Sequence, residues 1–138
     1  MFQVREGSGY FGVSGGTITH VISSTGTGVP STAAKFEVDL ISHDGDPGVA
    51  QLSTIIGGTT YGAWVSDSTN GTIALLPAGS AAPGTDIPVV ASLEADCTIN
   101  LTLWEAHTDQ YLQDCGGKIV LATSHETNCV SVTASLVQ

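Results

Sequence analysis

Apolar and polar residues alternate along much of this chain with the period of a β-strand. The clearest run is residues 129–137, in which apolar and hydroxylated side chains take turns almost without interruption. Successive side chains of a strand point to opposite faces, so this run predicts a half-buried strand. We expect Val130, Val132, Ala134 and Leu136 to face the core together.

The same alternation recurs at intervals of about eight to twelve residues, a spacing typical of all-β folds. In residues 35–42 it places Phe36, Val38 and Leu40 inward, and the Gly57-Gly58 pair after residues 49–56 indicates a two-residue hairpin turn. The predicted strands are residues 17–22, 35–42, 49–56, 59–65, 72–76, 87–93, 97–104, 118–123 and 129–137.

Loops and one short helix complete this map. Segments rich in Ser, Thr, Gly, Ala, Pro, Asn or Asp predict loops at residues 23–32, 67–71 and 77–86. Residues 108–115 are the one candidate helix, with Thr108 as N-cap and Gly116 at the C-terminal cap, and a β-type loop is the alternative there.

About nine short strands without a long helix predict an all-β domain. We expect a two-sheet antiparallel β-sandwich or jelly roll spanning residues 17–138. Residues 1–16 are glycine-rich and form either a bulged strand or an extended arm that becomes ordered against a partner. The arm is the preferred interpretation, with Tyr10, Phe11 and Val13 as its interaction residues.

The charge of the chain makes nucleic acids unfavourable partners. Three basic residues stand against 13 acidic ones, which gives a net charge of −10, and residues 36–117 contain no Lys or Arg. Affinity for nucleic acids depends largely on cations that neutralise phosphates, so nucleic-acid binding is not expected. Solubility comes instead from the net charge and from 14 Ser and 17 Thr residues.

The three cysteines cannot all pair within one chain. One disulfide with a free thiol, or three reduced thiols, are the alternatives. Cys115 and Cys129 are the candidate disulfide. Zinc binding by these two with His125 is disfavoured, because no two cysteines lie within two to four residues of each other.

The segment Ser42-His43-Asp44-Gly45-Asp46 is the most site-like part of the sequence. His43, Asp44 and Asp46 are candidate ligands of a hard cation such as calcium. Pro47-Gly48 interrupts any EF-hand pattern, and Asp, Gly and Pro all favour turns, so a structural turn is the preferred interpretation. We therefore expect no metal and no other cofactor.

No motif for catalysis occurs. The chain has no Gly-x-Ser-x-Gly nucleophile motif, and Glu94 and Asp96 flank a tight turn rather than a cleft. We therefore predict that the protein is not an enzyme.

Two further features of the sequence indicate where the protein is made and where it functions. No apolar run of 18 residues is present, and the first residues lack the apolar segment of a secretion signal. We expect synthesis in a cytoplasm without a cleavable signal, and function in a virion or at an extracellular surface.

In general character the chain is similar to small β-sandwich virion proteins, such as phage head-decoration or fibre subunits. We therefore expect a structural assembly protein that binds copies of itself, a larger protein lattice, or both. Pairing of exposed strand edges would supply the contacts. The alternative function is an extracellular carbohydrate-binding or adhesin module, because an exposed aromatic residue beside Asn and Asp can bind sugars.

Overall fold

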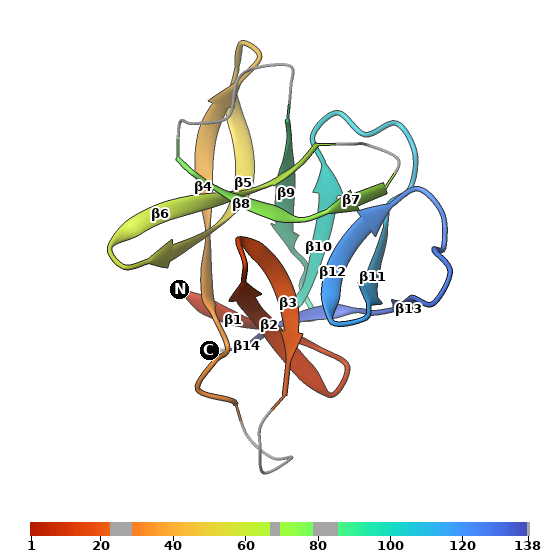
Figure 1. Cartoon of the computed structure of the whole chain (residues 1–138). Coiled ribbons are helices and arrows are strands. Elements are labelled where there is room, and N and C mark those ends of the chain that lie inside the picture. The colour runs from red at the N-terminus through yellow and green to blue at the C-terminus, as the bar shows by residue number, and fades with distance from the viewer. Residues whose placement is uncertain (23–28, 67–69, 79–85, 138) are drawn as a thin grey trace.

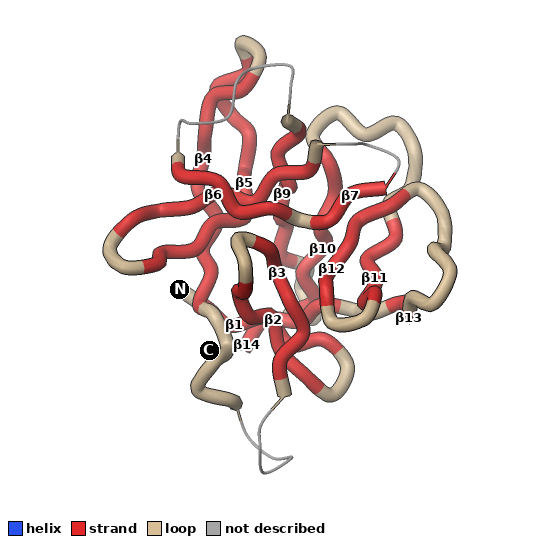
Figure 2. Tube along the Cα trace, viewed as in Figure 1, coloured by secondary structure: helices blue, strands red, loops and turns tan. Residues whose placement is uncertain are grey.

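The computed structural model describes residues 1–22, 29–66, 70–78 and 86–137. Within these ranges the regular structure is entirely β, and no helix occurs (Figure 1). Figure 2 shows the strands joined by short turns and loops. Parts of the three predicted loops, residues 23–28, 67–69 and 79–85, lie outside the described residues.

The described residues form fourteen strands. They are β1 (Phe2–Glu6), β2 (Gly9–Ser14), β3 (Thr17–Val21), β4 (Lys35–His43), β5 (Asp46–Ile56), β6 (Thr59–Val65), β7 (Asn70–Thr72), β8 (Ala74–Pro77), β9 (Ile87–Leu93), β10 (Thr98–Leu103), β11 (Tyr111–Cys115), β12 (Lys118–Ala122), β13 (Val130–Ser131) and β14 (Ala134–Val137).

The strands close into a nine-stranded β-barrel. Antiparallel pairs run from β1 through β2, β3, β8, β6, β5, β9, β10 and β14 back to β1. Strand β4 pairs with β1 and β5, while β12 joins β3 and is extended by β7, β11 and β13. The all-β prediction is confirmed. The closed barrel differs from the two packed sheets that the sequence led us to expect.

One hydrophobic core fills the barrel, and every strand of the closed cycle contributes to it. Phe11 of β2 and Phe36 of β4 are both fully buried and meet edge to face, with ring centroids 6.0 Å apart. In β10, Ile99, Leu101 and Leu103 alternate along the strand and are all buried. The core residues are Val4, Phe11, Ile18, Phe36, Leu52, Ala63, Val65, Ile73, Leu75, Val89, Ala91, Ile99, Leu101, Leu103, Ile119, Leu121 and Ala134.

Residues 1–16 are not a separate arm in this structure. They form β1 and β2, which pair with β14, β4 and β3, so this segment is part of the barrel wall. Phe11 is buried in the protein's own core, and Tyr10 and Val13 are half-buried. Glycine makes this possible, since a Cβ at Gly9 or Gly12 would overlap the side chain of His20 or Val21. The glycines that suggested a loose arm therefore allow close strand packing.

Two further predictions differ from the structure. The candidate helix at 108–115 is wrong, because residues 111–115 are strand β11 and pair with β12. The C-terminal run is divided into β13 and β14, which pair with different neighbours. Ala134 is buried as predicted, whereas Val130 is exposed, because β13 lies on β11 outside the main barrel.

Candidate functional site

The β4–β5 hairpin projects from the barrel and leaves one strand edge open. Strand β4 pairs with β1 only at Lys35 and Phe36, whereas its pairing with β5 continues to His43. Residues 37–43 therefore have a strand partner on one side only, among the residues that the structure describes. The hairpin rises at the top of Figure 1. An edge of this kind presents backbone N–H and C=O groups that can pair with another strand.

The tip of the hairpin is a two-residue turn. Asp44 and Gly45 both adopt positive φ, at 47° and 83°, as a type I′ turn requires, and His43 pairs with Asp46 across it. Asp46, Pro47 and Gly48, which the sequence placed in the turn, belong to β5 instead. The register between the strands shifts between Ile41 and His43, and bulges of this kind re-aim a side chain.

An aromatic cluster fixes the end of the hairpin to the body of the molecule. The buried ring of His43 meets Trp64 and Trp104 edge to face, at centroid distances of 5.4 Å and 4.9 Å. The indole N–H of Trp104 also donates to Oδ2 of Asp46 over 3.4 Å. These contacts hold the hairpin in one orientation, so the open edge is preformed.

The other face of the hairpin carries an apolar stripe. Val38 and Leu40 lie on the same face of β4, opposite Leu52 and Ala50 of β5. Leu52 is fully buried, whereas Val38 is 42% exposed and Leu40 is 76% exposed. The prediction that Val38 and Leu40 face the core is therefore wrong. The alternation of β4 is regular, but this part of the strand extends beyond the barrel and nothing in the described structure covers it.

The three candidate calcium ligands do not converge on one point. The side chain of His43 belongs to the aromatic cluster, and its Nε2 lies 3.7 Å from Oδ2 of Asp44. Asp46 accepts a hydrogen bond from the backbone N–H of Gly48 at Oδ1 and one from Trp104 at Oδ2. The arrangement is that of a structural turn with its aspartates used locally. Within the described residues, the His, Cys and carboxylate groups close enough to share an ion are Glu6, His20 and Asp114.

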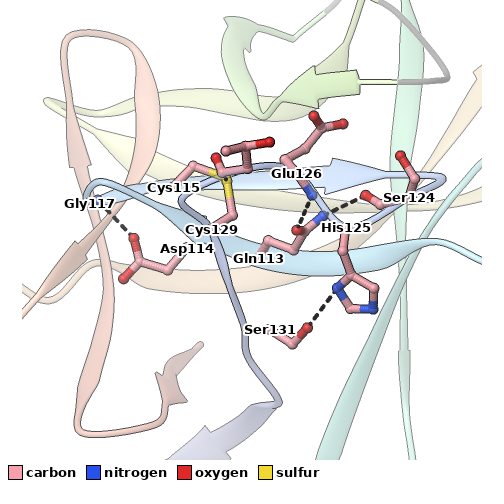
Figure 3. The surroundings of a disulfide bond; sticks show 10 residues. Gln113, Asp114, Cys115, Gly117, Ser124, His125, Glu126, Cys129 and Ser131 are labelled. Carbon is pink, nitrogen blue, oxygen red and sulfur yellow. Dashed lines mark hydrogen bonds between the residues drawn. A yellow bond between two sulfur atoms is a disulfide. The ribbon is translucent and has the colours of Figure 1, made fainter.

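Cys115 and Cys129, the pair chosen from the sequence, form a disulfide (Figure 3). It ties the end of β11 to the loop before β13. Beside it, the buried Gln113 side chain donates to the carbonyl of Ser124 over 3.0 Å and accepts from the N–H of Glu126 over 2.8 Å. The third thiol, Cys97, is free and exposed.

A cavity of about 750 Å³ lies beside Trp104. Its walls combine two aromatic rings, Trp104 and Tyr111, with polar side chains. Gln110 also lines the cavity, although its amide oxygen is buried and lacks a hydrogen-bond partner among the described residues. The remaining polar lining residues are Asn100, Thr102, Glu105, His107, Thr108 and Asp109.

Comparison of the chain with protein-family models, with curated proteins and with solved structures gives no match. In the described part of the chain, no helix is long and apolar enough to cross a membrane.

Proposed function

We propose that this protein is a structural assembly subunit, of a virion or comparable surface lattice, and that copies join by pairing their β4 edges. The observation that carries the proposal is the open edge of residues 37–43 with Leu40 exposed beside it. Main-chain hydrogen bonds would supply affinity, and burial of the apolar stripe would add to it. Because the hairpin is held by His43, Trp64 and Trp104, little ordering of this strand is needed on association.

The sequence of β4 favours one register between two copies. With the two strands antiparallel and centred on Leu40, Leu40 lies opposite its own copy, and Asp39 lies opposite Ile41. A register centred on Asp39 would place two carboxylates opposite each other, which is destabilising. The favoured register thus buries apolar side chains at its centre and separates like charges, and its two-fold symmetry closes the contact.

The net charge of −10 opposes association but does not decide it. At physiological ionic strength, charges more than about 8 Å apart in solvent are largely screened. The free energy of association is then set mainly by the groups at the interface. We expect association to strengthen as salt is raised from low concentration.

Leu40→Asp should convert an associating protein into a monomer. The substitution exchanges an exposed side chain, so the fold should persist, but it places two carboxylates together at the centre of the proposed interface. Sedimentation equilibrium of the full chain at physiological salt and high micromolar concentration checks this. Leu93→Asp is the matched control, since Leu93 is 61% exposed at the far end of β9 and should leave association unchanged. A monomeric native protein, or an associating Leu40→Asp variant, would contradict the proposal.

Carbohydrate binding is the second candidate, supported by the cavity beside Trp104. Aromatic rings flanked by amide and carboxyl groups suit a sugar, which has both an apolar face and hydroxyl groups. Neither Val38 nor Leu40 lines the cavity, so substitutions can test the two candidates separately.

A glycan array probed with the full chain tests this second candidate. If it is correct, a specific glycan is retained and Tyr111→Ala reduces its affinity at least tenfold, because one ring of the cavity is lost. Tyr10→Ala, which changes a half-buried ring on β2, is the control. Failure of every glycan to bind would exclude this function and leave the assembly proposal standing.

A further inference from the structure

Three side chains from distant strands converge outside the hairpin and the cavity beside Trp104. Glu6 ends β1, His20 lies on β3 and Asp114 lies on β11. Nδ1 of His20 contacts Oε1 of Glu6 directly and lies 3.6 Å from Oδ2 of Asp114. One potential ligand atom from each residue falls within 4.8 Å of the others.

The charge of this cluster is incompletely balanced. The side chain of Glu6 is only 1% exposed, and Asp114 is partly buried beside it. Among the described residues, neither carboxylate forms an ion pair with a lysine or arginine, and His20 is charged only if protonated. A buried carboxylate is costly unless a counter-charge compensates it. A bound cation would supply that charge permanently.

The surrounding structure orients His20 and Asp114. Oδ1 of Asp114 accepts a hydrogen bond from the N–H of Gly117 over 2.8 Å, which turns Oδ2 toward His20 (Figure 3 shows the bond to Gly117). The imidazole fits close to β2 because position 9 is glycine, where a Cβ would overlap the ring. The disulfide at Cys115 anchors the residue next to Asp114. Ligands held in this way lose little freedom on binding an ion.

Space for further ligands adjoins the cluster. The lining of a cavity of about 440 Å³ includes Glu6, His20 and Asp114 together with hydroxyl-bearing residues. The hydroxyl-bearing residues are Ser8, Ser131 and Thr133. Water can therefore complete the coordination of an ion held by three protein ligands, in an environment that can hydrogen-bond to that water.

We propose that Glu6, His20 and Asp114 bind a divalent transition-metal ion, with Zn²⁺ as the preferred ion. One imidazole and two carboxylates form a mixed nitrogen–oxygen set that suits zinc better than calcium or magnesium, which prefer oxygen alone. Ligands about 2.1 Å from a tetrahedral ion lie about 3.4 Å apart. The 3.6 Å between His20 and Asp114 already approaches that separation. Glu6 would move away from direct contact with His20 so that the ion lies between them.

Isothermal titration of the metal-free full chain with Zn²⁺ tests the proposal. We expect one tight equivalent per chain, and at least tenfold weaker binding in His20→Gln and in Asp114→Asn, which remove a ligand with little change in size. His107→Gln and Asp109→Asn change the same residue types around the other cavity and should bind as the native chain does. No tight equivalent, or unchanged binding in both ligand variants, would overturn the proposal.

A second measurement on the native chain is independent of how the variants fold. Co²⁺ has unpaired electrons and shifts the NMR signals of nearby nuclei, so it identifies which of the four histidines lies next to the ion. If, among the four histidine rings, only that of His20 shows large shifts, the result supports the site. Shifts centred on His43, His107 or His125 instead would overturn it.

Discussion

Phe11→Ala should lower the free energy of unfolding by about 3–5 kcal/mol, the usual cost of removing a fully buried phenylalanine. Phe11 has no exposed surface, packs edge to face against Phe36 and belongs to the single core of the barrel. The variant loses the transfer free energy of the ring and leaves a cavity between strands that cannot collapse freely. Chemical denaturation followed by circular dichroism measures the change.

Ile22→Ala is the matched control for this measurement. Ile22 also is apolar and lies just after β3, but it is 60% exposed, so its truncation should change stability by no more than about 0.5 kcal/mol. If Phe11→Ala were as stable as Ile22→Ala, residues 1–16 would be a dispensable arm, and their assignment to the barrel wall would be wrong.

Removal of the disulfide should also lower the free energy of unfolding substantially. Cys115 and Cys129 are separated by 14 residues, and a crosslink closing a loop of about 15 residues stabilises a fold by about 3 kcal/mol through the unfolded state. The double variant Cys115→Ser, Cys129→Ser should therefore unfold at a lower denaturant concentration. Neither cysteine belongs to the hydrophobic core, so the variant should still fold at room temperature.

Cys97→Ser provides the comparison. Its thiol is free and exposed, so the unfolding midpoint should stay within the error of the native value. A reductant should lower the midpoint of the native chain and of Cys97→Ser equally, and should leave the double variant unchanged. Equal midpoints for the native chain and the double variant would mean that the disulfide does not form in solution.

Much of the strand content could be predicted from the sequence, because alternation and turn residues are local signals. Ile99, Leu101 and Leu103 alternate and are all buried, and Gly57-Gly58 forms the predicted hairpin turn between β5 and β6. Barrel closure could not be predicted in this way. It depends on pairing between β1 and β14, from opposite ends of the chain, and inward and outward residues alternate equally in a sandwich and a barrel.

The candidate sites were harder to predict for the same reason. Alternation in β4 shows that Val38 and Leu40 share a face with Phe36, but only the packed structure shows that this face runs beyond the barrel. Glu6, His20 and Asp114 come from three separate strands and have no common spacing that could indicate a shared site. The sequence did carry one local signal of close packing, the glycine at position 9, which could be interpreted only once its neighbour His20 was known.

Crosslinking through Leu40→Cys, in a Cys97→Ser background, tests the proposed β4 pairing most directly. Opposed residues of an antiparallel pair have Cβ atoms about 4.5–5.5 Å apart, close to disulfide distance. The register centred on Leu40 therefore predicts a covalent dimer after mild oxidation. Leu93→Cys in the same background, an exposed leucine on β9 and not on the proposed β4 edge, should give only the low yield of random collisions. A Leu40→Cys variant that stays monomeric, or that crosslinks no better than Leu93→Cys, would contradict the account.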